Sequence, residues 1–189
     1  MGTMSTSDIR SGTKILVNGE PCSVIHNDFV KPGKGQAFNR IKFRQLRSDR
    51  VLEKTWKSGE QIEVADVHET SYRFIYQEGD TWHFMHPDTY EQVQASQSII
   101  DPIKNYLKAE DMVDLTFYEG EVIGIKVANF VWLKVIECGP NVKGDTVSGG
   151  TKTATLESQY TLRVPLFINE GELLKIDTRT GEYVGRQTS

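Results

Sequence analysis

Hydrophobic and polar residues alternate with a period of two along most of the chain, and turn-forming residues interrupt this pattern at short intervals. Such alternation is typical of half-buried β-strands. In the first third, the segment KILV is followed by Asn18-Gly19 and then by a second apolar run that ends at Val30. An Asn-Gly pair favours a two-residue hairpin turn. The pattern therefore predicts a β-rich fold that begins with a tight hairpin.

Two further hairpins are expected in the middle third. Residues 77–80 separate two aromatic segments in YRFIYQEGDTWHFMH, and Glu119-Gly120 separate two apolar segments in LTFYEGEVIGIKV. The last third contains short strand-like segments with turn residues between them, including FVWLKVIE, LRVPLFI and ELLKIDT. Short strands joined by turns at this spacing are what small β-barrels require.

One segment has the features of a helix. Asp101 is a favourable N-cap residue, and Pro102 suits the first helical position. Ile103, Tyr106 and Leu107 would then lie on one face of that helix. We therefore predict an all-β fold with a single short helix that starts after Asp101.

The distribution of charge divides the chain into thirds. Residues 1–65 carry a net charge of +4, residues 66–128 carry −8, and residues 129–189 are neutral overall, in agreement with the total of −4. A basic segment is expected to lie next to phosphate, whereas an acidic segment is expected to avoid it. Together with the strand pattern, this distribution predicts three small β-barrels in series, joined near residues 65 and 128.

The segment FVKPGKGQAF, residues 29–38, predicts a loop with an exposed lysine. Glycine permits backbone conformations that other residues avoid, and no bulky neighbour in the sequence covers Lys34. The loop is either an ordinary solvated turn or a site that presents Lys34 to a partner. Its tip consists of residues that combine flexibility with positive charge: Lys31, Pro32, Gly33, Lys34 and Gly35.

Two other roles for this loop fit the sequence less well. A phosphate-binding loop would need a glycine four residues before Gly33-Lys34, a Ser or Thr after it, and a following helix. Here Gln36 and Ala37 lead into a strand-like segment. A nucleophilic lysine would need burial or a neighbouring cation that lowers its pKa, and a glycine-rich tip provides little burial.

Three cations follow the loop on one predicted strand. Arg40, Lys42 and Arg44 alternate with Ile41 and Phe43, so one face of the strand can pack on a core while the other presents positive charge. This face is either a solvated surface or a candidate contact with the RNA backbone.

The sequence offers little support for a metal site, a cofactor or a membrane anchor. Cys22 and Cys138 are far apart and have no CxxC spacing, which favours a reducing, cytoplasmic environment. His83 and His86 would point to opposite faces of a strand, so we expect no metal ion there. We also find no apolar run long enough to span a bilayer.

Nearly the whole chain resembles bacterial elongation factor P, and it is similar in plan to the archaeal and eukaryotic translation factors that carry hypusine. The matching segments occur in the same order along the chain: FVKPGKGQAF, EKTWKSGE, ADV, WHFM, KGDT, VPLF and DTRTGEYVGR. The resemblance implies an SH3-like or KOW barrel at residues 1–65, an acidic OB-fold barrel at residues 66–128 and a second OB-fold barrel at residues 129–189.

The resemblance also implies a function that is not enzymatic. Members of this family bind the ribosome beside the peptidyl-tRNA, between the peptidyl and exit sites, and promote peptide-bond formation at consecutive prolines. Lys34 matches the residue that points to the peptidyl-transferase centre. We therefore expect a lysine-modifying ligase to extend Lys34 with a β-lysyl group, and we expect the extended side chain to position the CCA end. The factor is expected to act as a monomer without a separate cofactor.

Further contacts are implied outside the lysine loop. Gly144, Asp145 and Thr146 match a loop that lies near the exit-site codon in the family, and Tyr183 and Arg186 match a segment that contacts small-subunit RNA. The acidic middle barrel suits a basic protein of the ribosomal stalk. Simpler interpretations are a plain turn for the first set, and a half-buried tyrosine with a surface arginine for the second.

Two alternative functions remain open from the sequence. A general single-stranded nucleic-acid-binding barrel protein would need aromatic platforms on a basic groove, and the acidic middle third argues against one. An enzyme that uses Lys34 as a reactive amine would need an adjacent pocket.

Overall fold

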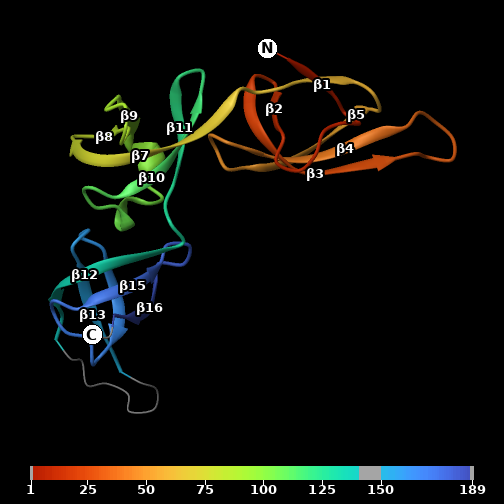
Figure 1. Cartoon of the computed structure of the whole chain (residues 1–189). Coiled ribbons are helices and arrows are strands. Elements are labelled where there is room, and N and C mark those ends of the chain that lie inside the picture. The colour runs from red at the N-terminus through yellow and green to blue at the C-terminus, as the bar shows by residue number, and fades with distance from the viewer. Residues whose placement is uncertain (1, 141–149, 188–189) are drawn as a thin grey trace. The chain divides into compact units, whose positions relative to one another are not determined.

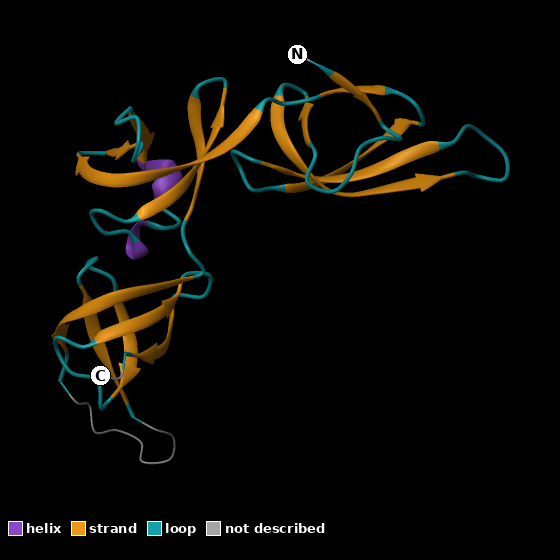
Figure 2. Cartoon of the chain, viewed as in Figure 1, coloured by secondary structure: helices purple, strands orange, loops and turns teal. Residues whose placement is uncertain are grey.

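The structure is a computed structural model, and it describes residues 2–140 and 150–187. Strands form most of the regular structure, with two very short helical segments between them (Figure 2). The strands assemble into three small β-domains, so the predicted all-β fold of three small barrels is confirmed.

The first barrel combines a four-stranded sheet with a two-stranded one (Figure 1). The four-stranded sheet has the strand order β2-β3-β4-β5, with bounds β2 (Lys14–Val17), β3 (Glu20–Val30), β4 (Phe38–Gln45) and β5 (Val51–Lys57). β1 (Thr3–Ser5) pairs antiparallel with β6 (Gln61–Glu63). The core of this barrel is formed by buried apolar side chains: Ile9, Ile15, Val17, Cys22, Val24, Ile41, Phe43, Trp56 and Ile62.

Two predicted hairpin turns have the backbone geometry that their sequences favour. Asn18 and Gly19 join β2 to β3 with φ values of 54° and 78°. Glu119 and Gly120, which follow β10, have φ values of 51° and 81°. Positive φ at both central residues is the mark of a type I′ turn, which suits the twist of paired strands. Both hairpin predictions are confirmed.

The middle sheet has the strand order β11-β10-β7-β8-β9. Its strands are β7 (Val67–Glu78), β8 (Thr81–Met85), β9 (Gln92–Ser96), β10 (Met112–Tyr118) and β11 (Glu121–Lys126). The predicted aromatic hairpin forms between β7 and β8, with Gly79 and Asp80 as the connecting residues. The Phe74 ring lies 5.0 Å from Trp82 and 5.5 Å from Phe84 between ring centroids, so the aromatic segments of the two strands build this core together.

The third barrel is a five-stranded sheet with the order β14-β13-β12-β15-β16. Its strands are β12 (Phe130–Cys138), β13 (Thr151–Leu156), β14 (Thr161–Pro165), β15 (Leu173–Asp177) and β16 (Glu182–Arg186). The outer strands β14 and β16 approach each other, so the sheet nearly closes into a barrel.

The predicted helix after Asp101 is wrong in position. A four-residue helix, α1 (Gln97–Ile100), ends at Asp101, and a 3-10 helix, η1 (Lys104–Tyr106), follows after a turn. The Asp101 carboxylate accepts hydrogen bonds from Gln97 Nε2 at 2.6 Å and from Lys104 Nζ at 3.0 Å. Asp101 therefore binds side chains on both sides of a turn, and it does not cap a helix that begins at Pro102.

Contacts divide the chain into two compact units, residues 1–70 with 115–124, and residues 71–114 with 125–189. In the first unit, Tyr118 and Ile123 are buried together with Ala65. In the second unit, the η1 residue Tyr106 is buried in the core of the third barrel and contacts the Tyr160 ring edge to face at 5.6 Å. Residues that precede β10 therefore complete the third-barrel core.

Candidate functional site: the hairpin that carries Lys34

β3 and β4 form a long hairpin, and residues 31–37 form its loop (Figure 1). The two strands pair from Cys22 and Gln45 at the base to Val30 and Phe38 next to the loop. A register shift between Val24 and His26 marks a bulge in β3. Lys34 lies in the middle of the loop, where the sequence predicted it.

Glycine is required by the backbone at one position of the tip. Gly35 has a φ of 122°, which residues with side chains rarely adopt, although an added Cβ would lie 3.6 Å from Pro32 Cγ, an ordinary contact. Gly33 has no such φ, and an added Cβ there would meet no atom within 4 Å. The expectation that the tip uses a backbone conformation reserved for glycine is therefore met by Gly35.

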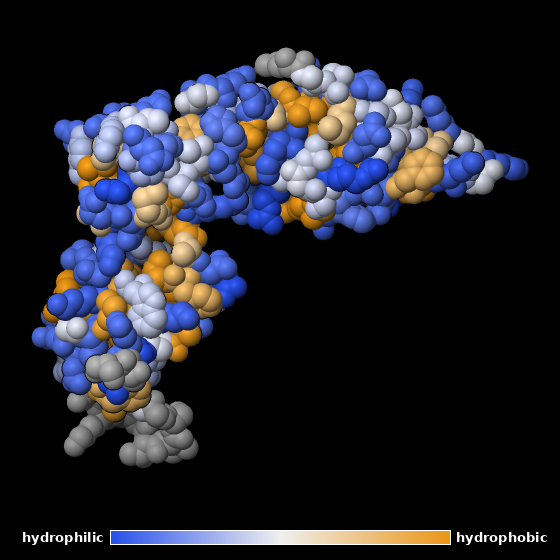
Figure 3. All heavy atoms as spheres, in the orientation of Figure 1, coloured by the Kyte–Doolittle hydropathy of each residue, from blue (hydrophilic) through white to orange (hydrophobic). Residues whose placement is uncertain are grey.

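Lys34 and Lys31 are exposed, whereas Pro32 is half-buried. Within residues 2–140 and 150–187, no hydrogen-bond acceptor or carboxylate lies within bonding distance of Lys34 Nζ. The loop is drawn in hydrophilic and intermediate colours (Figure 3). The amine is therefore available to a partner or to a modifying group.

A pair of asparagine side chains connects the hairpin to the N-terminal segment of the barrel. Asn39 is 2% exposed, and its Nδ2 donates to Asn27 Oδ1 at 3.0 Å. Asn27 Nδ2 in turn donates to the carbonyl oxygens of Thr6 at 2.8 Å and Ile9 at 3.0 Å. These bonds connect the loop-proximal half of β3 and β4 to residues 6–9.

Sequence reasoning missed this asparagine pair. Its signal is weak, because Asn39 occupies a core-facing position in FNRIKFR where an apolar residue is expected. Burial of a polar side chain at such a position is favourable only when it has hydrogen-bond partners.

The cations of β4 are arranged as predicted but are not equally free. Arg40, Lys42 and Arg44 are all exposed and alternate with buried residues. Arg44 Nη1 lies 2.9 Å from an Asp49 carboxylate oxygen, and Arg40 Nε lies 3.6 Å from Glu53 Oε1. This face therefore has mixed charge, and Lys42 forms no ion pair in the described part of the chain.

The candidate RNA contacts of the last third have different surroundings. Gly144, Asp145 and Thr146 lie outside the described residues. Tyr183 packs against the core of the third barrel. Arg186 Nη1 lies 2.7 Å from Glu172 Oε1, and its guanidinium lies 4.9 Å from the centre of the Phe167 ring. Arg186 would have to exchange these contacts to bind phosphate.

The histidines and the cysteine considered for metal binding or nucleophilic chemistry contribute to packing and turns. His83 is buried and stacks on Tyr76 at 4.3 Å, and His86 Nδ1 accepts backbone N–H groups from Asp88 and Thr89. In the described segments, no group of three His, Cys, Asp or Glu side chains is placed to hold a metal ion. Burial raises the pKa of the Cys22 thiol to about 11, so this thiol is a poor nucleophile.

No helix in residues 2–140 or 150–187 combines the length and the apolar character that crossing a membrane requires.

Three family models match consecutive parts of the chain. They are described as the Elongation factor P (EF-P) KOW-like domain at residues 5–62, the Elongation factor P (EF-P) OB domain at residues 67–125, and Elongation factor P, C-terminal at residues 131–186. The chain belongs to the elongation factor P family. Membership in this family identifies a translation factor that acts with the ribosome. The hairpin that carries Lys34 lies within the KOW-like match.

Solved structures of related translation factors share the fold. A eukaryotic translation initiation factor 5A from Methanococcus jannaschii matches with a TM-score of 0.53 at 20% identity, over 67% of this chain and 92% of that chain. A translation initiation factor eif-5a family protein from Naegleria fowleri ATCC 30863 matches with a TM-score of 0.53 at 18% identity, over 67% of this chain and 98% of that chain.

Proposed function

We propose that this translation factor binds the ribosome beside the peptidyl-tRNA, between the peptidyl and exit sites, and promotes peptide-bond formation at consecutive prolines. Lys34 is the residue that acts on the reaction, through the CCA end of the peptidyl-tRNA. The observation that carries the proposal is the position of Lys34, an exposed amine at the end of the β3–β4 hairpin that forms no hydrogen bond or ion pair with any described residue.

The chemical role of Lys34 is positioning. A prolyl amine is a hindered secondary nucleophile, and a proline-rich nascent chain can pull the peptidyl ester out of line, so the barrier lies largely in alignment. An ammonium group next to the CCA end can donate hydrogen bonds to riboses and neutralise backbone phosphates. The ribosome carries out the bond formation, and the factor supplies no acid, base or nucleophile.

We further propose that Lys34 is extended by a β-lysyl group, which a lysine-modifying ligase adds. Extension would lengthen the reach of the amine without breaking a polar contact, because Lys34 forms no hydrogen bond or ion pair with any described residue. The exposed position of the loop gives a ligase access to Nζ. Peptide masses of protein from its native source would test this proposal, with an increase equal to one lysyl residue at Lys34 expected and an unmodified Lys34 contradicting it.

Other contacts would hold the factor in place. We propose that the cations of the first barrel pair with RNA phosphates, that the acidic middle barrel contacts a basic protein of the ribosomal stalk, and that the third barrel lies near the exit-site codon. The residues proposed for RNA contact are Arg40, Lys42, Arg44, Gly144, Asp145, Thr146, Tyr183 and Arg186.

The proposal is tested with two reporters in a purified translation system. One encodes three consecutive prolines, and the other encodes alanines at the same positions. Protein from the native source should accelerate synthesis of the first reporter and leave the second unchanged. Equal acceleration of both reporters, or of neither, would contradict a role specific to proline.

A further inference from the structure

The outer face of β12 and β15 in the third barrel carries exposed aromatic residues next to cations. Leu133 and Val135 of β12 and Leu174 and Ile176 of β15 are buried in the core. The alternate positions of the same strands therefore face outward. Phe130 is 40% exposed and Trp132 is 42% exposed. The aromatic face is formed by these two residues and their neighbouring cations: Phe130, Trp132, Lys175 and Arg179.

The cations of the aromatic face are held close to the rings. Trp132 is the direct cross-strand partner of Lys175. Lys175 Nζ lies 4.6 Å from the centre of the Phe130 ring, and the Arg179 guanidinium lies 5.3 Å from the same centre. Cations at such distances are attracted to the ring face. The aromatic face therefore presents flat rings and positive charge side by side.

Asp177, the cross-strand partner of Phe130, and Glu157, which binds the backbone of Lys134, are both already engaged. Asp177 accepts hydrogen bonds from Arg179 Nε at 3.0 Å and from Arg179 Nη2 at 2.6 Å. Glu157 Oε1 accepts the Lys134 backbone N–H at 3.0 Å and lies 3.3 Å from Lys108 Nζ. Both negative charges are compensated locally, so Lys175 is left to attract an anion.

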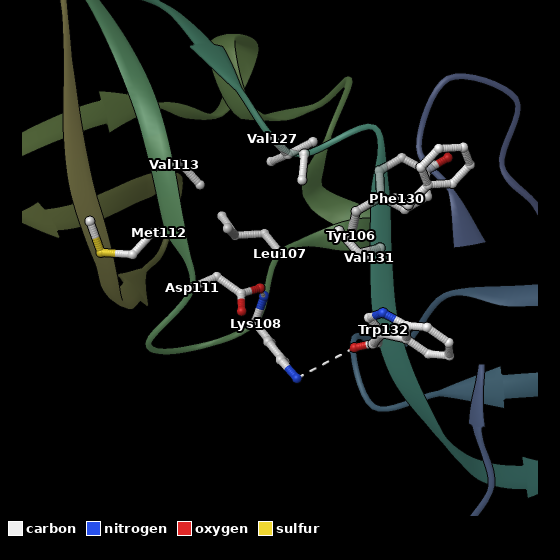
Figure 4. A pocket seen from close by; sticks show the side chains of 11 residues that line it. Tyr106, Leu107, Lys108, Asp111, Met112, Val113, Val127, Phe130, Val131 and Trp132 are labelled. Atoms are coloured by element: carbon white, nitrogen blue, oxygen red, sulfur yellow. Dashed lines mark hydrogen bonds between the residues drawn. The ribbon is translucent and has the colours of Figure 1, made fainter. Parts of the chain in front are cut away.

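Trp132 offers an open ring surface. Among the described residues, no other ring or cation packs over its indole, and no acceptor binds its indole N–H. A cavity of about 260 Å³, lined by residues that include Leu107 and Val113, lies beside β12. In Figure 4 the Trp132 indole extends away from Lys108, whose Nζ lies 3.5 Å from the Trp132 carbonyl oxygen.

We propose that the aromatic face binds an unpaired segment of RNA, with a nucleobase stacked on the Trp132 indole and the adjoining phosphates next to Lys175. Stacking on aromatic rings beside cations is how proteins hold single strands without reading their sequence. An acidic protein partner would use the cations but would leave the flat indole without a matching group, so RNA is the better fit. The inference rests on the ribosomal setting of the proposed function, but it does not depend on Lys34.

Binding of RNA to Trp132 can be observed by tryptophan fluorescence. Trp56 and Trp82 are 8% and 6% exposed, so a stacking ligand should mainly affect the emission of Trp132. The full chain is titrated with a dye-labelled, unstructured oligouridylate, and both tryptophan quenching and dye anisotropy are recorded. Quenching and a rise in anisotropy at the same oligonucleotide concentrations are expected.

Matched variants locate the binding surface. Trp132→Leu keeps an apolar side chain but removes the ring, and we expect affinity at least about fivefold weaker by anisotropy. Tyr90→Leu is the control, because Tyr90 is 69% exposed in the acidic middle barrel, and its affinity should be unchanged. Lys175→Gln should lower the salt dependence of binding by roughly one phosphate contact.

The proposal would be overturned by no binding of the oligonucleotide, by equal affinity of the unaltered chain and Trp132→Leu, or by equal losses in Trp132→Leu and Tyr90→Leu. Weaker ribosome binding by Trp132→Leu without any oligonucleotide binding would also overturn it, because that result indicates a protein partner. Lys34→Ala should bind the oligonucleotide normally. Failure of this inference is thereby separated from failure of the role proposed for Lys34.

Discussion

The first and third barrels both carry exposed cations, but they hold them differently. In the first barrel, Lys34 at the loop tip forms no ion pair with any described residue, and Arg40 lies 3.6 Å from Glu53. In the third barrel, Arg179 makes two hydrogen bonds to the Asp177 carboxylate, and Arg186 lies 2.7 Å from Glu172. The first barrel therefore presents a free lysine at a loop tip, whereas the cations named in the third barrel lie against carboxylates or aromatic rings.

This difference separates two kinds of contact with RNA. A free lysine on a long hairpin provides reach, and its entropy is lost only when it binds. Cations fixed beside aromatic rings provide a surface that is already arranged for its ligand. Net charge along the sequence indicates where cations are concentrated, but the pairing of each cation decides what it can do.

The largest effect on the fold is expected at the asparagine pair of the β3–β4 hairpin. Asn27→Ala removes both the donor to Thr6 and Ile9 and the acceptor of Asn39, and it leaves buried polar groups without partners. We expect a loss of about 2 to 3 kcal/mol in the free energy of unfolding, measured by chemical denaturation. Asn129→Ala, at an exposed position, is the control, and a loss of similar size there would contradict the stabilising role assigned to the asparagine pair.

A smaller effect is expected when free and paired cations of β4 are compared. Lys42→Gln should weaken ribosome binding by about threefold and reduce its salt dependence, because a free cation contributes fully to phosphate contact. Arg44→Gln should have less effect, since Arg44 is already paired with Asp49 at 2.9 Å. Binding is measured at several salt concentrations. A larger effect of Arg44→Gln than of Lys42→Gln would mean that an ion pair in the free factor does not prevent a cation from contacting RNA phosphates.

The smallest effect concerns the fixed ion pair of the third barrel. Hydrogen bonds from the Arg179 side chain and backbone lower the pKa of Asp177 from 3.8 to about 2. A carboxylate with a lowered pKa in the folded state stabilises the fold above its unfolded pKa, and this contribution is lost as the pH falls through the folded pKa. The melting temperature of Asp177→Asn should therefore fall less than that of the unaltered protein between about pH 4 and pH 2. These limits are roughly the unfolded and folded pKa values of Asp177. An identical fall in melting temperature in both proteins would contradict a stabilising role for the Asp177 carboxylate.

Local signals in the sequence predicted the elements that depend on neighbouring residues. The Asn18-Gly19 and Glu119-Gly120 turns, the alternation along β4 and the lysine loop all formed as expected, because turn chemistry and strand periodicity act over a few residues. The strand pattern and the distribution of charge predicted three small barrels, and the resemblance carried by motifs along the chain added the type of each barrel.

Features that depend on distant partners were missed. Asp101 was predicted to cap a helix, but its carboxylate binds Gln97 and Lys104 across a turn. Tyr106 was assigned to a helix face of the middle third, but it completes the core of the third barrel. The bonds from Asn27 to Thr6 and Ile9 join residues far apart in sequence. Such contacts are decided by the assembled fold, and spacing along the chain does not reveal them.

The most direct test of the role of Lys34 is the time needed to complete a tripeptide of consecutive prolines in a purified translation system. Protein from the native source is compared with Lys34→Ala, and Lys42→Gln serves as a control that removes a cation of the same hairpin. We predict acceleration by the native protein, no acceleration by Lys34→Ala despite an unchanged melting temperature, and retained acceleration by Lys42→Gln at saturating concentration. Full acceleration by Lys34→Ala would contradict the account, because the function would then not depend on the amine at the hairpin tip.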